Sequence, residues 1–216
     1  MSDKKRVIDV INSAFGGNEY PGDDYLLGSQ EGTEPMDEIK EFVGMDDWTT
    51  IDPNLLDMQS SALNFFSEAG FRFFLPAYLI ADLNEKLQKA DPIFTLVHGF
   101  GDMSVEHQVG SRVFERKTGK NAFVNPRRYG GMTFYDYARY RLSIFTREET
   151  QAIVTYLEYK RKYDNDGWKD EEIDAALNLF WYERAELAPT AESIATYLRE
   201  ESEYLSAISS NIDGSS

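Results

Sequence analysis

The amino-acid sequence predicts a mainly α-helical protein: a single compact domain of about seven or eight helices with a small β-hairpin near 111–124. Three observations predict this class. Apolar residues recur at helical spacing over most of the chain. Capping aspartates followed by proline mark helix starts at Asp52-Pro53 and Asp91-Pro92. Glycines and strand-like sequence gather instead in residues 99–133.

Length and composition set the domain organisation. A chain of 216 residues with 42% hydrophobic and 14% aromatic residues is long enough to bury a sizeable core. We expect one helical domain over residues 1–208, followed by a frayed tail over 209–216. Residues 99–133 are expected to be a glycine-rich basic insertion that carries the hairpin.

The helices of the first half follow from apolar stripes and cap signals. Val7, Ile11 and Phe15 form one stripe that ends at a glycine pair. The expected helices are 4–15, 36–43, one that begins at Pro53, one that begins after Ser67, and 92–98. The residues expected to face inward from 36–43 are Met36, Ile39, Phe42 and Val43.

The central helix is expected to be buried on nearly all sides. Aromatic and aliphatic residues fill 65–83 and leave little polar face after the N-cap Ser67. Pro76 lacks an N–H, and its ring clashes with the carbonyl of Arg72, so the helix should kink or restart there. We expect a carboxylate to hold Arg72, or its guanidinium to reach water.

The second half begins with the predicted hairpin, in which 112–116 pairs with 121–124 across a turn at 117–120. Residues 134–144 fit a strand or a helix equally well. From Thr146, the first residue of a capping box, the chain is helical again. The expected helices are 147–163, 170–188 and 190–208, the last capped by Thr190.

The charge of the chain is large and unevenly spread. The net charge is −16, with −10 in residues 1–60, +2 in 61–160 and −8 in 161–216. Such a field repels phosphate, so we expect no binding to nucleic acid or to an anionic membrane. An acidic surface keeps a protein soluble, and it also suits a basic protein partner. Both interpretations stay open.

The absence of cysteine and the short apolar runs indicate the cellular compartment of the protein. The chain has no cysteine, which excludes disulfides and thiolate metal sites and fits a reducing compartment. The longest apolar run without a charge, 73–81, is far shorter than the ~20 residues that span a bilayer. We therefore expect a cytoplasmic protein with no membrane association.

The candidate catalytic residues are His98, Asp102 and His107. Together with Arg112 they would supply an acid, a base and an anion stabiliser to a hydrolase or transferase with its site in 98–131. The glycines at 99 and 101 argue against one continuous helix, so we expect no metal site. No phosphate loop or Gly-x-Ser-x-Gly elbow is present, and no cofactor is expected.

Acidic pairs are numerous but are expected to be solvated surface acids rather than catalytic carboxylates. They are Asp23-Asp24, Asp46-Asp47, Glu148-Glu149 and Glu200-Glu201.

A basic segment stands out in this acidic chain. Residues 110–128 have a net charge of +5. Either the segment lies on the acidic body through complementary charge, or it is an arm that binds an anion or a partner. Its candidate binding residues are Arg112, Arg116, Lys117, Lys120, Arg127 and Arg128.

Four stretches together resemble an uncharacterised family of small acidic bacterial proteins, a domain of unknown function. They are 11–15 with the acidic loop after it, Trp48 to Leu55, the Phe-Phe-Leu-Pro-Ala-Tyr-Leu run within 70–79, and 145–159 with 176–181. The resemblance spans 7–185 with a gap at about 99–133. It implies a bacterial source and a compact helical fold, and it implies no activity, ligand or catalytic residue.

The function expected from these observations is non-catalytic recognition of a basic protein in the bacterial cytoplasm. A toxin-immunity protein is one concrete version of it. The alternatives are the hydrolase or transferase with its site in 98–131 and a structural subunit whose acidic surface only keeps it soluble.

Overall fold

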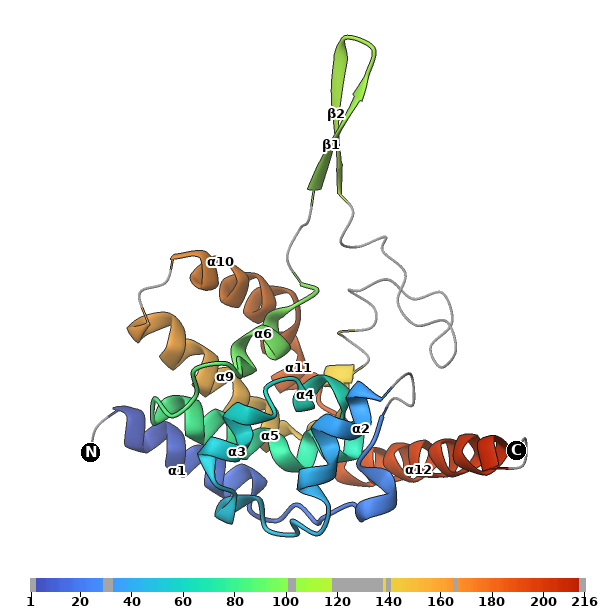
Figure 1. Ribbon diagram of the computed structural model, residues 1–216. Helices are drawn as coiled ribbons and strands as arrows, with labels where there is room; N and C mark the ends of the chain where they lie inside the picture. Colours follow the sequence, from blue (N-terminus) through green and yellow to red (C-terminus); the bar gives the residue numbers. More distant parts are fainter. Residues whose placement is uncertain are drawn as a thin grey trace.

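The computed structural model of the protein describes residues 3–28, 33–100, 104–117, 138, 141–164 and 167–213. Side chains are described in these ranges except in 104–109, 113–117, 167–168, 201, 205 and 208–213. In this part of the chain the protein is mainly helical, as the sequence predicts, and a two-stranded hairpin projects from the helical body (Figure 1).

The elements follow one another in a simple order. The N-terminal half contains α1 (Asp3–Phe15), η1 (Asp23–Tyr25), α2 (Glu34–Ile39), η2 (Lys40–Phe42), η3 (Trp48–Thr50), α3 (Pro53–Met58), α4 (Ala62–Phe65), α5 (Glu68–Leu83) and α6 (Pro92–Val97). The remainder contains β1 (Ser104–Val109), β2 (Arg112–Lys117), η5 (Leu142–Ile144), α9 (Arg147–Tyr163), α10 (Gly167–Ala176), the π-helical turn η6 (Leu177–Trp181), α11 (Tyr182–Leu187) and α12 (Ala191–Asp213).

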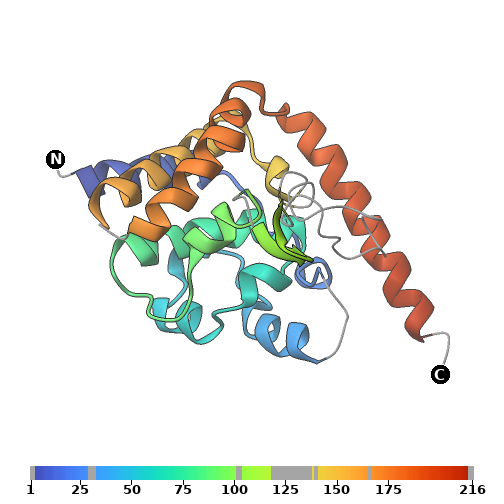
Figure 2. The ribbon, with the colours of Figure 1, turned by 90° about the horizontal axis from the view of Figure 1, so that it is seen from above.

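Helix α5 is the centre of the fold, and 12 of its 16 residues are buried. Helices α1, α3, α4, α6 and α12 all contact it, while α12 continues outward past the body to the C-terminus (Figure 2). The predicted N-cap is confirmed, because the hydroxyl of Ser67 accepts a hydrogen bond from the Gly70 N–H at 3.0 Å. Of the two outcomes expected at Pro76, a restart does not occur: α5 continues through it, since packing on every side outweighs one lost hydrogen bond, and a kink there stays a prediction.

Aromatic rings fill the core on two sides of α5. Phe74 stacks on Phe66 at 4.8 Å between ring centroids and meets Phe42 edge-on at 5.1 Å. Towards α9, Phe71 contacts Phe145 at 5.8 Å. Such pairs contribute beyond their buried area, so this run of phenylalanines fixes the orientation of the neighbouring elements.

The other predicted helix caps are confirmed. Asp52 accepts from the Asn54 N–H at 2.9 Å and Asp91 from the Phe94 N–H at 3.1 Å, with proline following in each case. Thr190 accepts from the N–H of Ser193 at 3.2 Å at the start of α12. These side chains satisfy backbone donors that the first helical turn leaves open.

A buried ion pair joins α5 to α9. Arg72 Nε lies 2.9 Å from Glu149 Oε2, and Arg72 Nη2 lies 2.9 Å from Glu149 Oε1. Oε2 also accepts from the Thr146 N–H at 2.8 Å, which completes the predicted capping box. The Glu149 side chain is 1% exposed, so its prediction as a surface acid is wrong, whereas Arg72 is held by a carboxylate as expected.

A second polar tie joins the same two helices near their C-terminal ends. The Tyr156 hydroxyl donates to Asp82 Oδ2 at 2.6 Å, and Lys160 Nζ lies 3.0 Å from the same oxygen. Lys160 also pairs with Asp164 at 2.6 Å. Burial raises the pKa of Tyr156, and the Asp82 carboxylate raises it further. Burial alone would lower the pKa of Lys160, but Asp164 and Asp82 together raise it.

The predicted inward face of 36–43 is partly wrong. Pro35, Ile39 and Phe42 are buried, whereas Met36 is 56% and Val43 51% exposed. Helix α2 buries Pro35 and Ile39 rather than Met36, and the 3₁₀ turn η2 ends at Phe42, so Val43 lies in extended backbone. Two apolar side chains are therefore left at the surface.

The predicted hairpin also has a different pairing. In the structure β2 pairs with β1, which precedes it, and the turn between them is Gly110-Ser111. Gly110 has φ 65°, a conformation that glycine adopts without strain in two-residue hairpin turns. The predicted turn residues 118–120 and the predicted strand 121–124 lie outside the described residues.

Two predicted helix ends shift as well. The stretch predicted over 170–188 runs from Gly167 to Leu187, with the π-helical turn η6 inside it. That turn lets Phe180 and Trp181 both face the core. The backbone of α12 is helical to Asp213, so the helix extends beyond its predicted end at 208, and residues 209–213 of the predicted frayed tail are helical.

The Arg72–Glu149 pair makes a first prediction. Glu149→Ala leaves Arg72 charged and only 20% exposed, and should lower the free energy of unfolding by about 3–5 kcal/mol in urea denaturation. The control is Lys40→Ala, which removes an exposed pair with Asp37 and should change stability by less than about 1 kcal/mol. Equal losses in the two variants would contradict the assignment.

The Tyr156 cluster makes a second prediction. A tyrosine whose folded pKa is raised stabilises the fold below its unfolded value of about 10, and that stability is lost as the pH rises further. The raised pKa of Lys160 acts in the same direction. Urea denaturation between about pH 9 and 11 should show stability falling less steeply in Tyr156→Phe than in the wild type.

Candidate functional site

The predicted catalytic residues are not brought together within the described part of the chain. His98 follows α6 directly, and its exposed ring stacks on Phe94 at 4.5 Å. His107 lies in β1, opposite Phe114 of β2, and only its backbone is described. Asp102 lies outside the described residues. No group of three or more His, Asp or Glu side chains suited to a metal ion occurs among the residues with described positions.

A charged neighbour of His98, Glu172, comes from α10, and no sequence pattern indicated it. Burial raises the pKa of Glu172, Asp91 raises it further, and His98 acts against both. Lys169 Nζ lies 2.9 Å from Asp91 Oδ2, so the capping aspartate is also ion-paired. The cluster joins α6 to α10. Its aspartate, Asp91, already caps α6 and pairs with Lys169.

This placement gives a third prediction. His98→Ala removes one exposed ring and its stacking on Phe94, so the free energy of unfolding should fall by less than about 1.5 kcal/mol. Thermal or urea denaturation checks this. A larger loss of stability would show that His98 has a structural role. The variant could then not be used to test the predicted enzymatic activity.

The predicted basic arm is described only in part. Arg112 is exposed at the start of β2, opposite Val109. Arg116 and Lys117 end the same strand, with only their backbones described. Lys120, Arg127 and Arg128 lie outside the described residues. Both interpretations of the arm therefore stay predictions: that it lies on the acidic body, and that it binds an anion or a partner.

An acidic surface with exposed apolar side chains lies on α2 and η2. We define the α2–η2 surface as residues 34–47, which contain six acidic residues and one base. That base, Lys40, is already paired with Asp37 at 3.2 Å. Met36 and Val43 are exposed among these charges. The acidic residues are Glu34, Asp37, Glu38, Glu41, Asp46 and Asp47.

A further exposed methionine borders this surface. The carboxylate of Glu38 accepts a hydrogen bond from the Ser61 N–H at 3.1 Å, which ties α2 to the end of the α3–α4 connection. Met58 lies three residues before Ser61 and is 70% exposed. Methionine is a flexible, polarisable side chain that adapts to varied partners. The surface therefore combines negative charge with adaptable apolar contacts.

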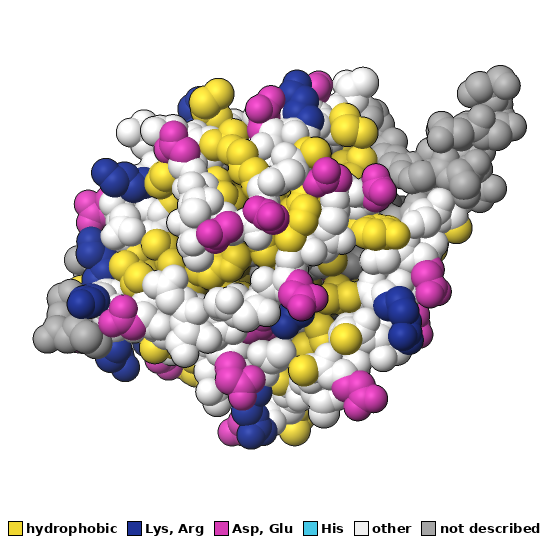
Figure 3. Space-filling model, turned by 90° about the horizontal axis from the view of Figure 1, so that it is seen from below, with side chains coloured by type: hydrophobic (Ala, Val, Ile, Leu, Met, Phe, Trp, Pro, Cys, Tyr) yellow, Lys and Arg dark blue, Asp and Glu magenta, His cyan; other side chains and the backbone are white. Residues whose placement is uncertain are grey.

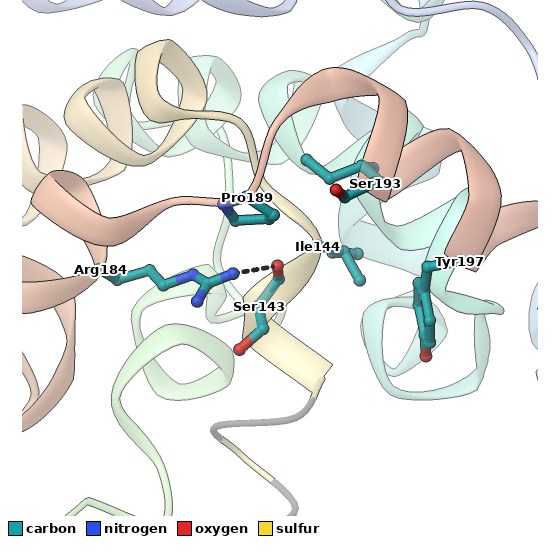
Figure 4. Close-up of a pocket in the computed structure, with 7 residues that line it drawn as sticks. Ser143, Ile144, Arg184, Pro189, Ser193 and Tyr197 are labelled. Atoms are coloured by element: carbon teal, nitrogen blue, oxygen red, sulfur yellow. Dashed lines mark hydrogen bonds between the residues drawn. The ribbon is translucent and has the colours of Figure 1, made fainter.

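A small pocket lies where α12 leaves the body (Figure 4). Its volume is about 200 Å³, with Ser143 and Arg184 on one side and Ser193 and Tyr197 of α12 on the other. The Arg184 guanidinium donates to the Ser143 carbonyl at 2.7 Å and so holds η5 against α11. The contact is structural and leaves a mainly apolar hollow too small for most ligands.

Comparison with known proteins finds no match: no family model, no curated protein and no solved structure resembles this chain. The resemblance to a bacterial domain of unknown function therefore stays a prediction. In the part of the chain with described positions, none of the helices has both the length and the apolar character needed to cross a membrane.

Proposed function

We propose that this protein is a binding protein that recognises a basic protein partner through the α2–η2 surface. The observation that carries the proposal is the exposure of Met36 and Val43 on a surface that contains six acidic residues. The one lysine of this surface, Lys40, is already paired with Asp37. An exposed apolar side chain framed by one sign of charge is typical of a recognition surface.

The charges and the apolar side chains have separate roles in this proposal. The carboxylates attract a basic partner from a distance and set its orientation, an effect that weakens as salt screens it. Met36 and Val43 then supply apolar area that is buried on contact. A helix or loop with lysine or arginine around an apolar stripe meets both requirements.

The net charge of the whole chain supports the same choice of partner. A protein of net charge −16 repels acidic partners in general and attracts basic ones. In its most specific form, the proposal is that of a bacterial immunity protein whose partner is a basic toxin. That form predicts that the partner loses its toxic activity in the complex.

The fourth prediction tests the surface with a labelled helical peptide of lysine and leucine that fall on opposite faces. Fluorescence anisotropy at low salt should show binding to the wild type. The triple variant Glu34→Lys/Glu41→Lys/Asp46→Lys should weaken binding at least about tenfold, or roughly 1.4 kcal/mol. Met36→Ser/Val43→Ser should weaken it at least about fivefold at unchanged net charge.

The matched control carries the same change of charge elsewhere. Glu171→Lys/Glu192→Lys/Glu200→Lys alters three exposed acids of α10 and α12 and should bind within about twofold of the wild type. If this control loses as much affinity as the first triple variant, net charge alone drives binding and the proposal fails. Co-purification from the native host, with both triple variants beside the wild type, then identifies the partner.

A further inference from the structure

A groove lies on the face of the molecule opposite the hairpin, where hydrophobic side chains line hollows between charged ones (Figure 3). The segment 17–21 after α1, the first turns of α5 and the first half of α12 enclose it, with a volume of about 610 Å³. This is within the range of about 300–1,000 Å³ in which proteins bind small molecules.

The walls of the groove are apolar and set back. Phe73 of α5 and Leu198 of α12 provide hydrophobic surface. Three further positions carry small side chains that leave the space open: Ala69 of α5 and Ala191 and Ala195 of α12. An apolar group of a ligand can therefore lie between α5 and α12.

Three hydrogen-bond donors in this groove lack an acceptor. The amide nitrogen of Asn18 is buried and has no hydrogen-bond partner among the described residues. Arg72 uses Nε and Nη2 on Glu149, and Nη1 has no acceptor in the described part of the chain. Arg199 has no acidic partner within 4 Å among the residues whose side chains are described. Of these three, only the Asn18 amide is a buried donor without an acceptor among the described residues, which is unfavourable, whereas Arg199 is exposed. A ligand that supplies acceptors would satisfy this amide and pair with the Arg199 guanidinium.

The charges around the groove limit the ligand to one negative charge. Arg72 is neutralised by Glu149, which leaves Arg199 and the exposed Glu19 as the remaining charged residues of the lining. A dianion such as a phosphate ester would lack a second free cation. A carboxylate needs only one cation together with one or two neutral donors, and its two oxygens match a guanidinium.

We propose that this groove binds a monocarboxylate with an apolar body, its carboxylate held by Arg199, Arg72 Nη1 and the Asn18 amide and its apolar part between Phe73 and Leu198. The source is either a free carboxylic acid or the C-terminal carboxylate of a peptide with an apolar last residue. This site is separate from the α2–η2 surface, so its test does not depend on the proposed function.

One wall of the groove is fixed in position. Tyr20 packs edge-on against Phe73 at 5.4 Å, and its hydroxyl donates to Asp23 at 2.5 Å. The Gly44 N–H in turn donates to Asp23 Oδ1 at 2.9 Å. Because the tyrosine hydroxyl is engaged with Asp23, it does not compete for the ligand carboxylate, and the segment 17–21 is held against α5.

The fifth prediction uses octanoate, with 1-octanol as the uncharged analogue, and isothermal titration calorimetry on the full chain. Octanoate should bind in a saturable way, and octanol at least about tenfold more weakly. Arg199→Ala should weaken octanoate at least about tenfold, and Asn18→Asp should do the same by placing a like charge against it. Ala195→Phe, which fills the groove, should abolish binding of both.

The control is Arg6→Ala, which removes an exposed arginine of α1 outside the groove and should leave binding unchanged. Circular dichroism and a melting curve confirm that each variant is folded before titration. A Leu-ended peptide and its C-terminal amide identify the source: binding of the free peptide alone points to a peptide terminus, and binding of octanoate alone to a free acid. The proposal is overturned if octanol binds as tightly as octanoate, if Arg6→Ala weakens binding as much as Arg199→Ala, or if no acid binds up to about 10 mM.

Discussion

The ion pair between Arg72 and Glu149 is the constraint on which much of the structure depends. One carboxylate, 1% exposed, accepts from Nε and Nη2 of the Arg72 guanidinium of α5 and from the backbone N–H of Thr146, the N-cap of α9. Burying a carboxylate costs free energy unless a cation pairs with it and its oxygens accept hydrogen bonds. The start of α9 is therefore fixed relative to α5, and Phe145, just before it, is placed against Phe71. The same pair turns the free end of Arg72 towards the groove beneath α12.

The second polar tie, made by Asp82, Tyr156 and Lys160, lies towards the other end of the same two helices. Hydrogen-bonded charges fix the relative position of two helices more strictly than apolar contacts do. Two buried polar ties at opposite ends select one register of α5 against α9. The elements that carry the α2–η2 surface and the groove are then built around this pair of helices. The Gly44 N–H, which donates to both Tyr20 and Asp23, connects the end of that surface to the wall of the groove.

Local signals in the sequence predicted the helices well, because caps act over three or four residues. Ser67, Thr146 and Thr190 are all caps in the structure, and the burial of α5 follows from its unbroken apolar composition. Errors arose where the outcome depends on distant parts of the chain. The spacing of Met36 and Val43 fits an inward face, but α2 buries Pro35 and Ile39 instead of Met36, and Val43 lies beyond the 3₁₀ turn in extended backbone. The hairpin turn lies at Gly110-Ser111, a two-residue hairpin signal, and not at the predicted 117–120.

The binding surfaces were less predictable than the helices. Net charge pointed to a basic partner, but it did not show which acids surround exposed apolar side chains. The groove brings together Asn18, Arg72 and Arg199, which are far apart in the sequence, so no spacing rule could reveal it. Glu149 shows the same limit: its capping role was visible in the sequence, whereas its burial depends on Arg72, 77 residues away.

A double-mutant cycle between Arg72 and Glu149 tests the central claim most directly. Arg72→Met, Glu149→Gln and the double variant would be compared with the wild type by urea denaturation. If the pair ties α5 to α9, the two substitutions are strongly non-additive, with a coupling energy above about 1 kcal/mol. A coupling energy below about 0.5 kcal/mol would contradict the account, because independent effects at the two positions would mean that the pair does not join the helices.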